Sequence, residues 1–414
     1  MVRAASVPAL AGLLMLSGCV TGARLPPPPE LISSAAPDGF SDQVRLVTID
    51  RRDFDKRAPQ LLSRLSRTAT DGTVDYLVLS GGGAGGSFGA GALIGMSRRH
   101  DRPQFEVVTG VSAGALIAPF AYLGPEWDPE LKAAFAGLGR FHLPRFAALA
   151  IVKRFLFPLG QSGHDALFRL VNAFVTPSMI RAVAHDYAQG RLLFIATTDL
   201  DKEETVVWNM GLIAQHGGMA ARKLFRDVLV ASASVPGIFP PVMIRVEDGG
   251  HQYEEMHVDG SVTTSLFAVP LIAQILPISS PARQPANLYV IINGNLVSPP
   301  SETPVNTLGV LSHSFSADLK YKARDSLLLA IEYARSRDMR LRMTEIPPEY
   351  PYHGFADFNA ADMRQLFEYG VRCGSTGQLW ETAAQSLRRN LHVHAERSSG
   401  SRPAACPAID PNSE

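Results

Sequence analysis

The residue types that could carry out covalent chemistry are concentrated around one serine. Ser112 stands between Gly110 and Gly114 in a Gly-x-Ser-x-Gly pattern, directly after the apolar run 105–109. In a sharp turn from strand into helix, this pattern lifts the serine hydroxyl clear of the sheet, and the neighbouring residues must be small to permit the turn. The run 113–121 that follows is apolar and compatible with a helix, whose N-terminal partial positive charge would favour an oxyanion. The pattern is common by chance in a glycine-rich chain, but its place between a predicted strand and a predicted helix favours Ser112 as a nucleophile.

A second glycine-rich turn follows another apolar run, residues 76–79. It reads Gly-Gly-Gly-Ala-Gly-Gly over residues 81–86 and begins with Gly81, Gly82 and Gly83. Without side chains, the N–H groups of these three glycines would be unobstructed and able to donate to a developing negative charge. Removing one such donor typically costs about 2.7–4 kcal/mol of transition-state stabilisation. This turn is therefore a candidate oxyanion hole.

The same turn also fits a dinucleotide-binding fingerprint. Gly81, Gly83 and Gly86 satisfy G-x-G-x-x-G after a strand, and an acidic residue, Glu106, follows about twenty residues later. Glu106, however, lies within its predicted strand instead of at the strand's end, and the serine turn follows at once. An exported protein, which the leader described below predicts, also meets little NAD. The oxyanion interpretation is therefore favoured over the dinucleotide one.

Short apolar runs alternate with helical patterns along the middle of the chain. We predict strands at residues 76–79, 105–109, 192–197, 205–208, 254–258 and 288–292, a helix at 88–99, and a mostly helical stretch at 307–343. Strand, crossover helix and strand form a parallel unit, so we expect an α/β fold with a mostly parallel central sheet and helices on both faces. Because right-handed crossovers bring the carboxyl ends of parallel strands to one edge, the two glycine-rich turns should be neighbours in space.

Four motifs in this order resemble the patatin-like phospholipase family. They are the glycine loop 81–86, the serine turn 110–114, the Ser-Ala-Ser-Val-Pro-Gly-Ile-Phe-Pro-Pro run 232–241, and the pair Asp259-Gly260, all within residues 76–295. The order of all four is far more specific than any one motif. The resemblance implies the three-layer α/β/α fold of that family. It also implies hydrolysis of acyl esters of membrane lipids, such as glycerophospholipids, by an enzyme of the phospholipase A or lysophospholipase kind.

The resemblance further implies a role for each site residue. Ser112 would attack the ester carbonyl, Asp259 would accept its proton and return it to the leaving alcohol, and the amides of residues 81–83 would hold the oxyanion. Such a dyad needs no metal or organic cofactor, because a serine, a carboxylate and backbone amides complete the chemistry. The chain departs from the family's pattern at two positions. Gly85 occupies a position where the family often has Lys or Arg, and Ser261 stands where the family's Asp-Gly-Gly/Ala motif ends in Gly or Ala. Without this cation, the glycine loop is not expected to bind a phosphate head group through a positive charge.

Other interpretations of the same residues stay open. Asp-Gly is among the commonest turn pairs, so Asp259 could be a turn aspartate. Histidine is the usual partner of a catalytic serine, and His257, His313 or His353 could complete a Ser-His-Asp triad. An alternative from a different class is a lipid-binding or scaffold lipoprotein that keeps the fold without catalysis.

The N-terminus resembles a bacterial lipoprotein leader. A charged residue, Arg3, precedes the apolar run 7–16, which is too short to span a bilayer, and a Leu-Ser-Gly-Cys sequence ends at Cys19. We therefore expect a signal peptide over residues 1–18, acylation of Cys19 and attachment on the periplasmic side of a membrane, with Val20 favouring the outer membrane. Several acyl chains on one residue give stable attachment, because each buried methylene adds about 0.8 kcal/mol.

The rest of the chain is expected to form one enlarged domain with appendages. We divide it into a proline-rich tether at 19–45, an N-terminal extension at 46–75, the hydrolase domain at 76–345, and a C-terminal extension with a disordered tail at 346–414. Three cysteines are too few for a disulfide scaffold. Once Cys19 is acylated, Cys373 and Cys406 either pair or stay as free buried thiols.

Charge and local patterns constrain the partners. Lys plus Arg and Asp plus Glu number 39 each, so the overall charge does not suggest nucleic acid. The aromatic and basic stretch 144–157 is predicted to be an insertion packed on the sheet, with an amphipathic flap at a membrane surface as the alternative. The basic stretch 335–342 is interpreted as a solvated helix face. The expected partners are a membrane lipid substrate and the membrane that holds Cys19.

Overall fold

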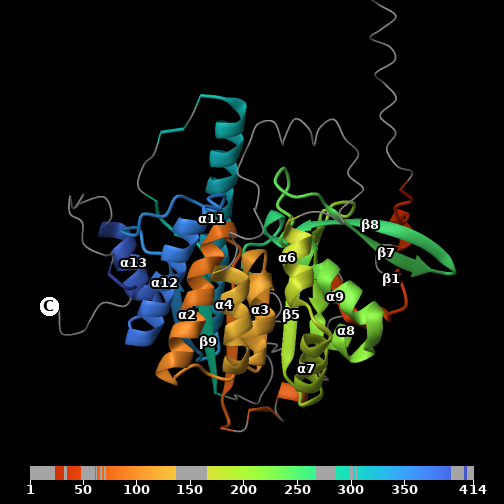
Figure 1. Ribbon diagram of the computed structural model, residues 1–414, viewed down its shortest axis with the longest axis horizontal. Helices are drawn as coiled ribbons and strands as arrows, with labels where there is room; N and C mark the ends of the chain where they lie inside the picture. Colours follow the sequence, from red (N-terminus) through yellow and green to blue (C-terminus); the bar gives the residue numbers. More distant parts are fainter. Residues whose placement is uncertain are drawn as a thin grey trace, which may run out of the picture.

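The described part of the computed structural model forms one sheet with helices on either side (Figure 1). It comprises residues 24–31, 35–47, 61, 63–65, 68–69, 71–136, 166–266, 285–298, 302–303, 305–392 and 405–407. The strands are β1 Ala36–Pro37, β2 Arg45–Val47, β3 Val74–Leu79, β4 Val107–Val111, β5 Leu192–Asp199, β6 Glu204–Asn209, β7 Val242–Asp248, β8 His251–Asp259, β9 Ala286–Ile292 and β10 Arg340–Glu345. The α-helices are α2 Gly86–Arg99, α3 Ala113–Leu123, α4 Asp128–Ala136, α6 Ala166–Phe174, α7 Pro177–Ala188, α8 Met210–His216, α9 Gly218–Ser232, α11 Thr307–Ser336, α12 Ala360–Thr376 and α13 Ala383–His392. Short 3₁₀ helices are η2 Pro29–Leu31, η3 Asp42–Val44, η4 Gly83–Gly85, η5 Pro125–Trp127 and η8 Gly260–Val262.

The central part of the sheet is parallel, and its β5 side is antiparallel. The strand order is β1-β7-β8-β5-β4-β3-β9-β10, with β6 beside β5 and β2 beside β6. The pairs from β10 through β9, β3 and β4 to β5 are all parallel. β8 and β6 both run antiparallel to β5, and β7 runs antiparallel to β8. The expected α/β fold with a parallel core is therefore present.

The alternation of side chains along the parallel strands divides the core into two layers. On β3, Leu77 and Leu79 pack into a cluster with α2, α3 and α12, whereas Tyr76 and Val78 pack into a second cluster with α11. Successive side chains of a strand point to opposite faces, and a strand buried on both faces is apolar throughout. The result is the three-layer arrangement seen in Figure 1, with α11 behind the sheet and α2, α3, α4 and α12 in front.

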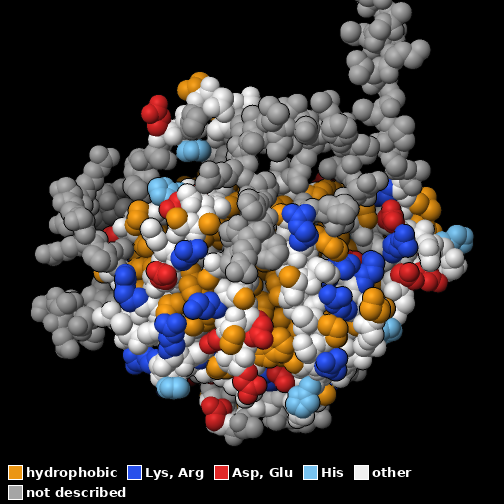
Figure 2. Space-filling model, viewed as in Figure 1, with side chains coloured by type: hydrophobic (Ala, Val, Ile, Leu, Met, Phe, Trp, Pro, Cys, Tyr) orange, Lys and Arg blue, Asp and Glu red, His pale blue; other side chains and the backbone are white. Residues whose placement is uncertain are grey.

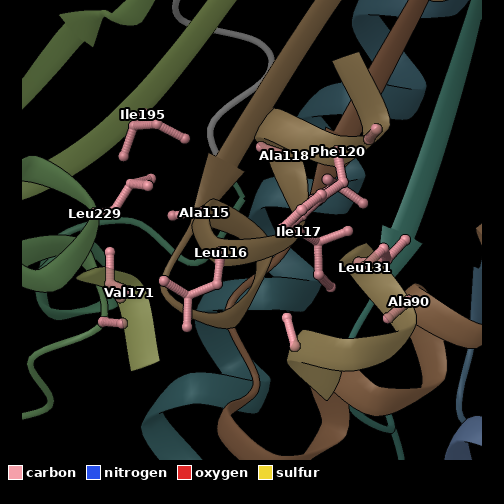
Figure 3. Packing of buried hydrophobic residues seen from close by; sticks show 14 of the residues in the cluster. Ala90, Ala115, Leu116, Ile117, Ala118, Phe120, Leu131, Val171, Ile195 and Leu229 are labelled. Atoms are coloured by element: carbon pink, nitrogen blue, oxygen red, sulfur yellow. The ribbon is translucent and has the colours of Figure 1, made fainter. Parts of the chain in front are cut away.

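Helix α3 lies in the middle of the front layer and carries the serine turn at its N-terminus. Its side chains Ala115 to Ala118 and Phe120 are at most 7% exposed. Figure 3 shows them packed among Leu131 of α4, Val171 of α6, Ile195 of β5 and Leu229 of α9. Because α3 is held on all sides by apolar contacts, the turn in front of it has a rigid support.

The C-terminal part of the chain packs against the same layer through glycines. A Cβ placed on Gly91 of α2 would lie 2.1 Å from the carbonyl oxygen of Phe367, and one on Gly370 of α12 would lie 2.3 Å from that of Phe88. Only glycine lets the two helix backbones approach this closely. A disulfide between Cys373 on α12 and Cys406, with a Cα–Cα distance of 5.4 Å, then holds residues 405–407 to α12. Of the two alternatives for these cysteines, the structure contains the pair.

Two predicted element boundaries were wrong. The strand expected at 105–109 is β4, Val107–Val111, because it pairs with β3 as far as Leu79 and with β5 as far as Ala196. The helix expected to continue to residue 343 ends at Ser336, and Arg340–Glu345 is instead an edge strand that pairs in parallel with β9. Asp338, with φ 57°, turns the chain out of the helix. The basic stretch 335–342 is therefore only in part a helix face.

Part of the expected tether also packs into the sheet. Residues 36–37 pair with β7, and 45–47 pair with β6. The guanidinium of Arg45, 4% exposed, forms a buried ion pair with Glu255 of β8. These contacts anchor the chain before the first central strand.

Several predictions fall on residues that the structure does not describe. They are the signal peptide 1–18 with Cys19, the aromatic and basic stretch 144–157 and the tail after residue 407. Among the described residues, no single helix has both the length and the apolar composition to cross a bilayer, and the one pair that passes jointly, α6 with α7, is bent by 62°. On the face drawn in Figure 2, basic and acidic side chains are both spread among apolar ones.

Candidate active site

Ser112 lies in a strained turn between β4 and α3. Its backbone has φ 54° and ψ −123°, a conformation that residues other than glycine rarely adopt and that persists only where the surroundings enforce it. The backbone N–H of Ser112 donates to Oγ of Ser232 over 3.1 Å, and that hydroxyl donates to the carbonyl oxygen of Ala196 over 2.7 Å. Ser232 therefore ties the turn to β5.

The glycines of the serine turn are needed for close packing. A Cβ on Gly110 would lie 2.6 Å from the carbonyl oxygen of Gly114, and one on Gly114 would lie 2.4 Å from that of Leu79. A Cβ on Gly86, at the start of α2, would lie 2.8 Å from that of Ala113. The small residues thus let the first turns of α2 and α3 meet at the end of β3, as the pattern predicted.

Asp259 is the last residue of β8, and it meets Ser112 directly. Oγ of Ser112 donates to Oδ2 of Asp259 over 2.5 Å, and the backbone N–H of Ser261 donates to Oδ1 over 2.8 Å. The carboxyl group is fully buried. This burial raises the pKa of Asp259 to about 6, although the hydrogen bonds from Ser112 and Ser261 act in the opposite direction. The carboxyl is thus poised to gain or lose a proton close to neutral pH.

Strand β5 brings the two side chains together from distant parts of the chain. Ala196 pairs with Val111, and the next residue, Thr197, pairs with Asp259. The ends of β4 and β8 therefore meet head on along one side of β5. The backbone N–H of Asp259 also donates to the carbonyl oxygen of Ser234 over 3.0 Å. The run 232–241 thus contacts both the serine turn and the backbone of Asp259.

The glycine loop lies beside Ser112. A Cβ on Gly81 would lie 3.2 Å from the Cβ of Ser112 and 2.3 Å from Oγ of Ser261. The N–H of Gly81 donates to the carbonyl oxygen of Ser265 over 3.2 Å, so this donor is already engaged. Among the described residues, no acceptor contacts the N–H of Gly82 or of Gly83. These two amides are the free donors of the loop, and Gly81 supplies the space next to the serine.

The loop is held in place by a residue that the sequence did not single out. Asn293 directly follows β9; its side-chain amide donates to the carbonyl oxygen of Ser80 over 2.7 Å, and its backbone N–H donates to Oγ of Ser80 over 2.8 Å. A Cβ on Gly82 would lie only 1.7 Å from the carbonyl oxygen of Asn293. Its place directly after a predicted strand, at the sheet edge where the glycine loop lies, was the signal that could have indicated Asn293. For Ser232, the signal was its place before the Val-Pro-Gly turn.

The histidines considered for a triad lie elsewhere. His257 is buried, with Nδ1 3.0 Å from Oγ1 of Thr197 and Nε2 3.3 Å from Oε2 of Glu255. His313 and His353 line a large cavity that the glycine loop borders. The hydrogen-bond partner of the Ser112 hydroxyl is Asp259.

Glu106 likewise lies away from the glycine loop. Its carboxylate accepts the backbone N–H of Asp75 over 2.6 Å, at the start of β3. This is the opposite edge of the sheet from the loop, so Glu106 is not positioned to complete a dinucleotide site there.

One buried cluster has the residue types of a metal site. Ligand atoms of Asp199, Glu255 and His257 lie within 4.8 Å of one another. Lys202, however, pairs with both carboxylates, and Arg45 pairs with Glu255. Although burial acts to raise it, the pKa of Glu255 is lowered overall, chiefly by the charge of Arg45. Protein cations already supply the positive charge that a metal would bring.

The cavity beside the site has a volume of about 870 Å³. It is bounded by residues 80–82, the loop 292–298, the first half of α11 and the loop 348–356. Ser112, only 3% exposed, adjoins this wall, because a Cβ on Gly81 would lie 3.2 Å from the Cβ of Ser112. The cavity is large enough for a drug-sized ligand or an acyl chain with part of a head group.

The model of one protein family matches the region that contains the site. The family model for patatin-like phospholipase matches residues 77–272, which include both glycine-rich turns and Asp259. This match agrees with the resemblance found in the sequence. No curated protein matches the chain.

Three solved structures are similar at low identity. VipD from Legionella pneumophila is 11% identical with a TM-score of 0.32, covering 77% of this chain and 70% of its own. Human GIVD cytosolic phospholipase A2 is 12% identical with a TM-score of 0.36, covering 83% and 65%. The type III effector protein ExoU is 16% identical with a TM-score of 0.25, covering 73% and 53%. This chain thus spans less than two thirds of the human enzyme and about half of ExoU.

Proposed function

We propose that this protein hydrolyses acyl esters of membrane lipids with Ser112 as nucleophile and Asp259 as general base. The match of residues 77–272 to the patatin-like phospholipase model supports a lipid acyl hydrolase. The observation that carries the finer assignment is the 2.5 Å hydrogen bond from the Ser112 hydroxyl to a fully buried carboxylate. A general base must lie within hydrogen-bond reach of the proton that it removes.

The reaction follows from this geometry in two halves. Oγ of Ser112 attacks the ester carbonyl carbon while its proton passes to Oδ2 of Asp259, and the N–H groups of Gly82 and Gly83 donate to the oxyanion that forms. The C–O bond to the alcohol then breaks, and Asp259 gives the proton to the leaving oxygen. Water attacks the acyl–serine, Asp259 accepts its proton, and that proton returns to Ser112 as the fatty acid leaves.

Covalent labelling and product analysis test this proposal together. A fluorophosphonate probe is expected to label the wild-type protein but not Ser112→Ala, and the wild type should release fatty acids from a panel of phospholipids and neutral glycerides. Asp259→Asn should label slowly and release none. Labelling that persists in Ser112→Ala, or a wild type that neither labels nor releases fatty acid, would favour a binding or scaffold protein.

We also propose that Cys19 is acylated and holds the enzyme at a membrane on the periplasmic side. The support is the lipoprotein-like leader ending at Cys19. Detergent phase partitioning of full-length protein and a Cys19→Ser variant tests it. The wild type should enter the detergent phase and the variant should not, and equal partitioning would contradict acylation.

A further inference from the structure

The cavity beside the glycine loop carries two basic side chains without acidic partners. Lys320 and Arg324 are four residues apart on α11, so they lie on one face of the helix, and both line the cavity. The ammonium of Lys320 donates to the hydroxyl of Ser298, and the guanidinium of Arg324 donates to the carbonyl oxygen of Leu296. These acceptors are neutral. Among the described residues, no carboxylate forms an ion pair with either cation.

The lack of an acidic partner sets Lys320 and Arg324 apart from another cation on the same helix. Lys322, two residues away, pairs with Asp318 over 2.8 Å, so α11 supplies acidic partners elsewhere. Glu302 and Glu349 border the cavity but do not pair with Lys320 or Arg324. Partial burial, and next the charge of Arg324, lower the pKa of Lys320. Two like charges held together in a half-enclosed cavity are stabilised by an anion between them.

The glycine loop has no room for a cation of its own. A Cβ on Gly85 would lie 2.1 Å from the carbonyl oxygen of Asn293 and 2.8 Å from the Tyr352 hydroxyl. A lysine or arginine therefore does not fit at this position without rebuilding the loop. Position 85 therefore supplies no positive charge for a substrate anion.

The cavity lies between these cations and the glycine loop. Gly81 and Gly82 form one wall, and the α11 face forms another. Ser112 adjoins the first wall, because a Cβ on Gly81 would lie 3.2 Å from the Cβ of Ser112. In Figure 1 the first half of α11 rises beyond the other layers. A ligand in this cavity thus lies between the α11 cations and the glycine wall that adjoins Ser112.

We infer that Lys320 and Arg324 bind the phosphate group of a phospholipid substrate whose acyl ester is held at Ser112. The inference rests on the proposed function, since it assigns the head-group end of the same substrate. A phosphate oxyanion suits both partners, because the guanidinium offers paired N–H donors and the ammonium a compact charge. Lys320 and Arg324 would thus select phospholipids over neutral glycerides.

A pair of substrates with identical acyl chains tests the selection. Dihexanoyl phosphatidylglycerol carries the phosphate, and dihexanoylglycerol lacks it. Lys320→Gln should lower the ratio of kcat/KM for the first over the second by about tenfold or more, as expected for a lost charge-assisted hydrogen bond. Lys320→Arg should restore most of the ratio. Arg335→Gln, at an exposed α11 position paired with Glu332, is the matched charge control and should leave the ratio at the wild-type value.

Binding without turnover separates this inference from the proposed function. Titration calorimetry of Ser112→Ala with dihexanoyl phosphatidylglycerol should show binding that weakens about tenfold when Lys320→Gln is added. This measurement decides the inference even if the wild type hydrolyses neither substrate. An unchanged kcat/KM ratio, or unchanged affinity in the double variant, would overturn it. Equal affinity for inorganic phosphate would identify a free-phosphate site and overturn the head-group assignment.

Discussion

The hydroxyl of Ser232 lies 3.1 Å from the backbone nitrogen of Ser112 and links the strained serine turn to β5. We expect Ser232→Ala to leave the buried N–H of Ser112 without a partner. An unsatisfied buried donor costs about 1–3 kcal/mol, so both the unfolding free energy and kcat should fall. Ser336→Ala, which removes an exposed hydroxyl at the end of α11, should change neither by a comparable amount. Denaturant unfolding and ester turnover provide the readouts, and a fully active, equally stable Ser232→Ala would contradict the linking role.

Backbone strain at Ser112 predicts a difference between two inactive variants. Ser112→Ala and Ser112→Gly both remove the hydroxyl and should lower turnover at least about a thousandfold. At φ 54°, alanine keeps the strain and glycine relieves it. After the greater chain entropy of unfolded glycine is counted, Ser112→Gly should be the more stable by about 1 kcal/mol. Thermal unfolding of the two purified variants measures this difference, and the opposite order would show that the turn is unstrained.

The raised pKa of Asp259 predicts how activity depends on pH. A general base acts as its carboxylate, so kcat/KM should be level above pH 6 and fall about tenfold per pH unit below it. Initial rates on a neutral short-chain ester across pH 4–8 measure the profile. A profile that is flat through this range, or one that rises toward acid, would exclude Asp259 as the base.

The same carboxyl group should also make stability depend on pH. Because the folded pKa, about 6, exceeds the unfolded value, the folded state holds the proton more tightly. This stabilisation is complete below the unfolded pKa of about 3.9 and is lost as the pH rises through 6. Above pH 6 the buried charge costs on the order of 2–3 kcal/mol. Asp259→Asn should therefore abolish turnover yet be more stable than the wild type at pH 7, and this gain should vanish near pH 4. Unfolding at the two pH values tests the sign.

Close packing of the glycine loop predicts opposite responses at two glycines. In Gly82→Ala the new methyl group would overlap the carbonyl oxygen of Asn293 at 1.7 Å, so stability should fall by about 1–3 kcal/mol and activity should be lost. Gly294→Ala meets no atom within 4 Å and should stay within about 0.5 kcal/mol of the wild type. Chemical unfolding and fluorophosphonate labelling of both variants provide the comparison. A tolerated Gly82→Ala would mean that the loop does not hold the described conformation.

The sequence by itself determined the local features of this protein. The turn around Ser112 follows from small residues between an apolar strand and an apolar helix, and these constraints act within a few positions. The parallel strands follow from apolar runs that are buried on both faces. Asp259 could be named only because four motifs occur in one order, since an Asp-Gly pair alone predicts no more than a turn.

The tertiary structure decided what depends on distant segments. The edge strand Arg340–Glu345 continues a helical pattern in the sequence and becomes a strand because β9 offers it a partner. Ser232 and Asn293 hold the site through contacts to residues more than a hundred positions away, and such contacts leave no local pattern. Likewise, Lys320 and Arg324 have the spacing of an ordinary polar helix face. Only folding places them on the wall of a cavity that also contains Gly81, because the sheet brings the ends of separate strands to one edge.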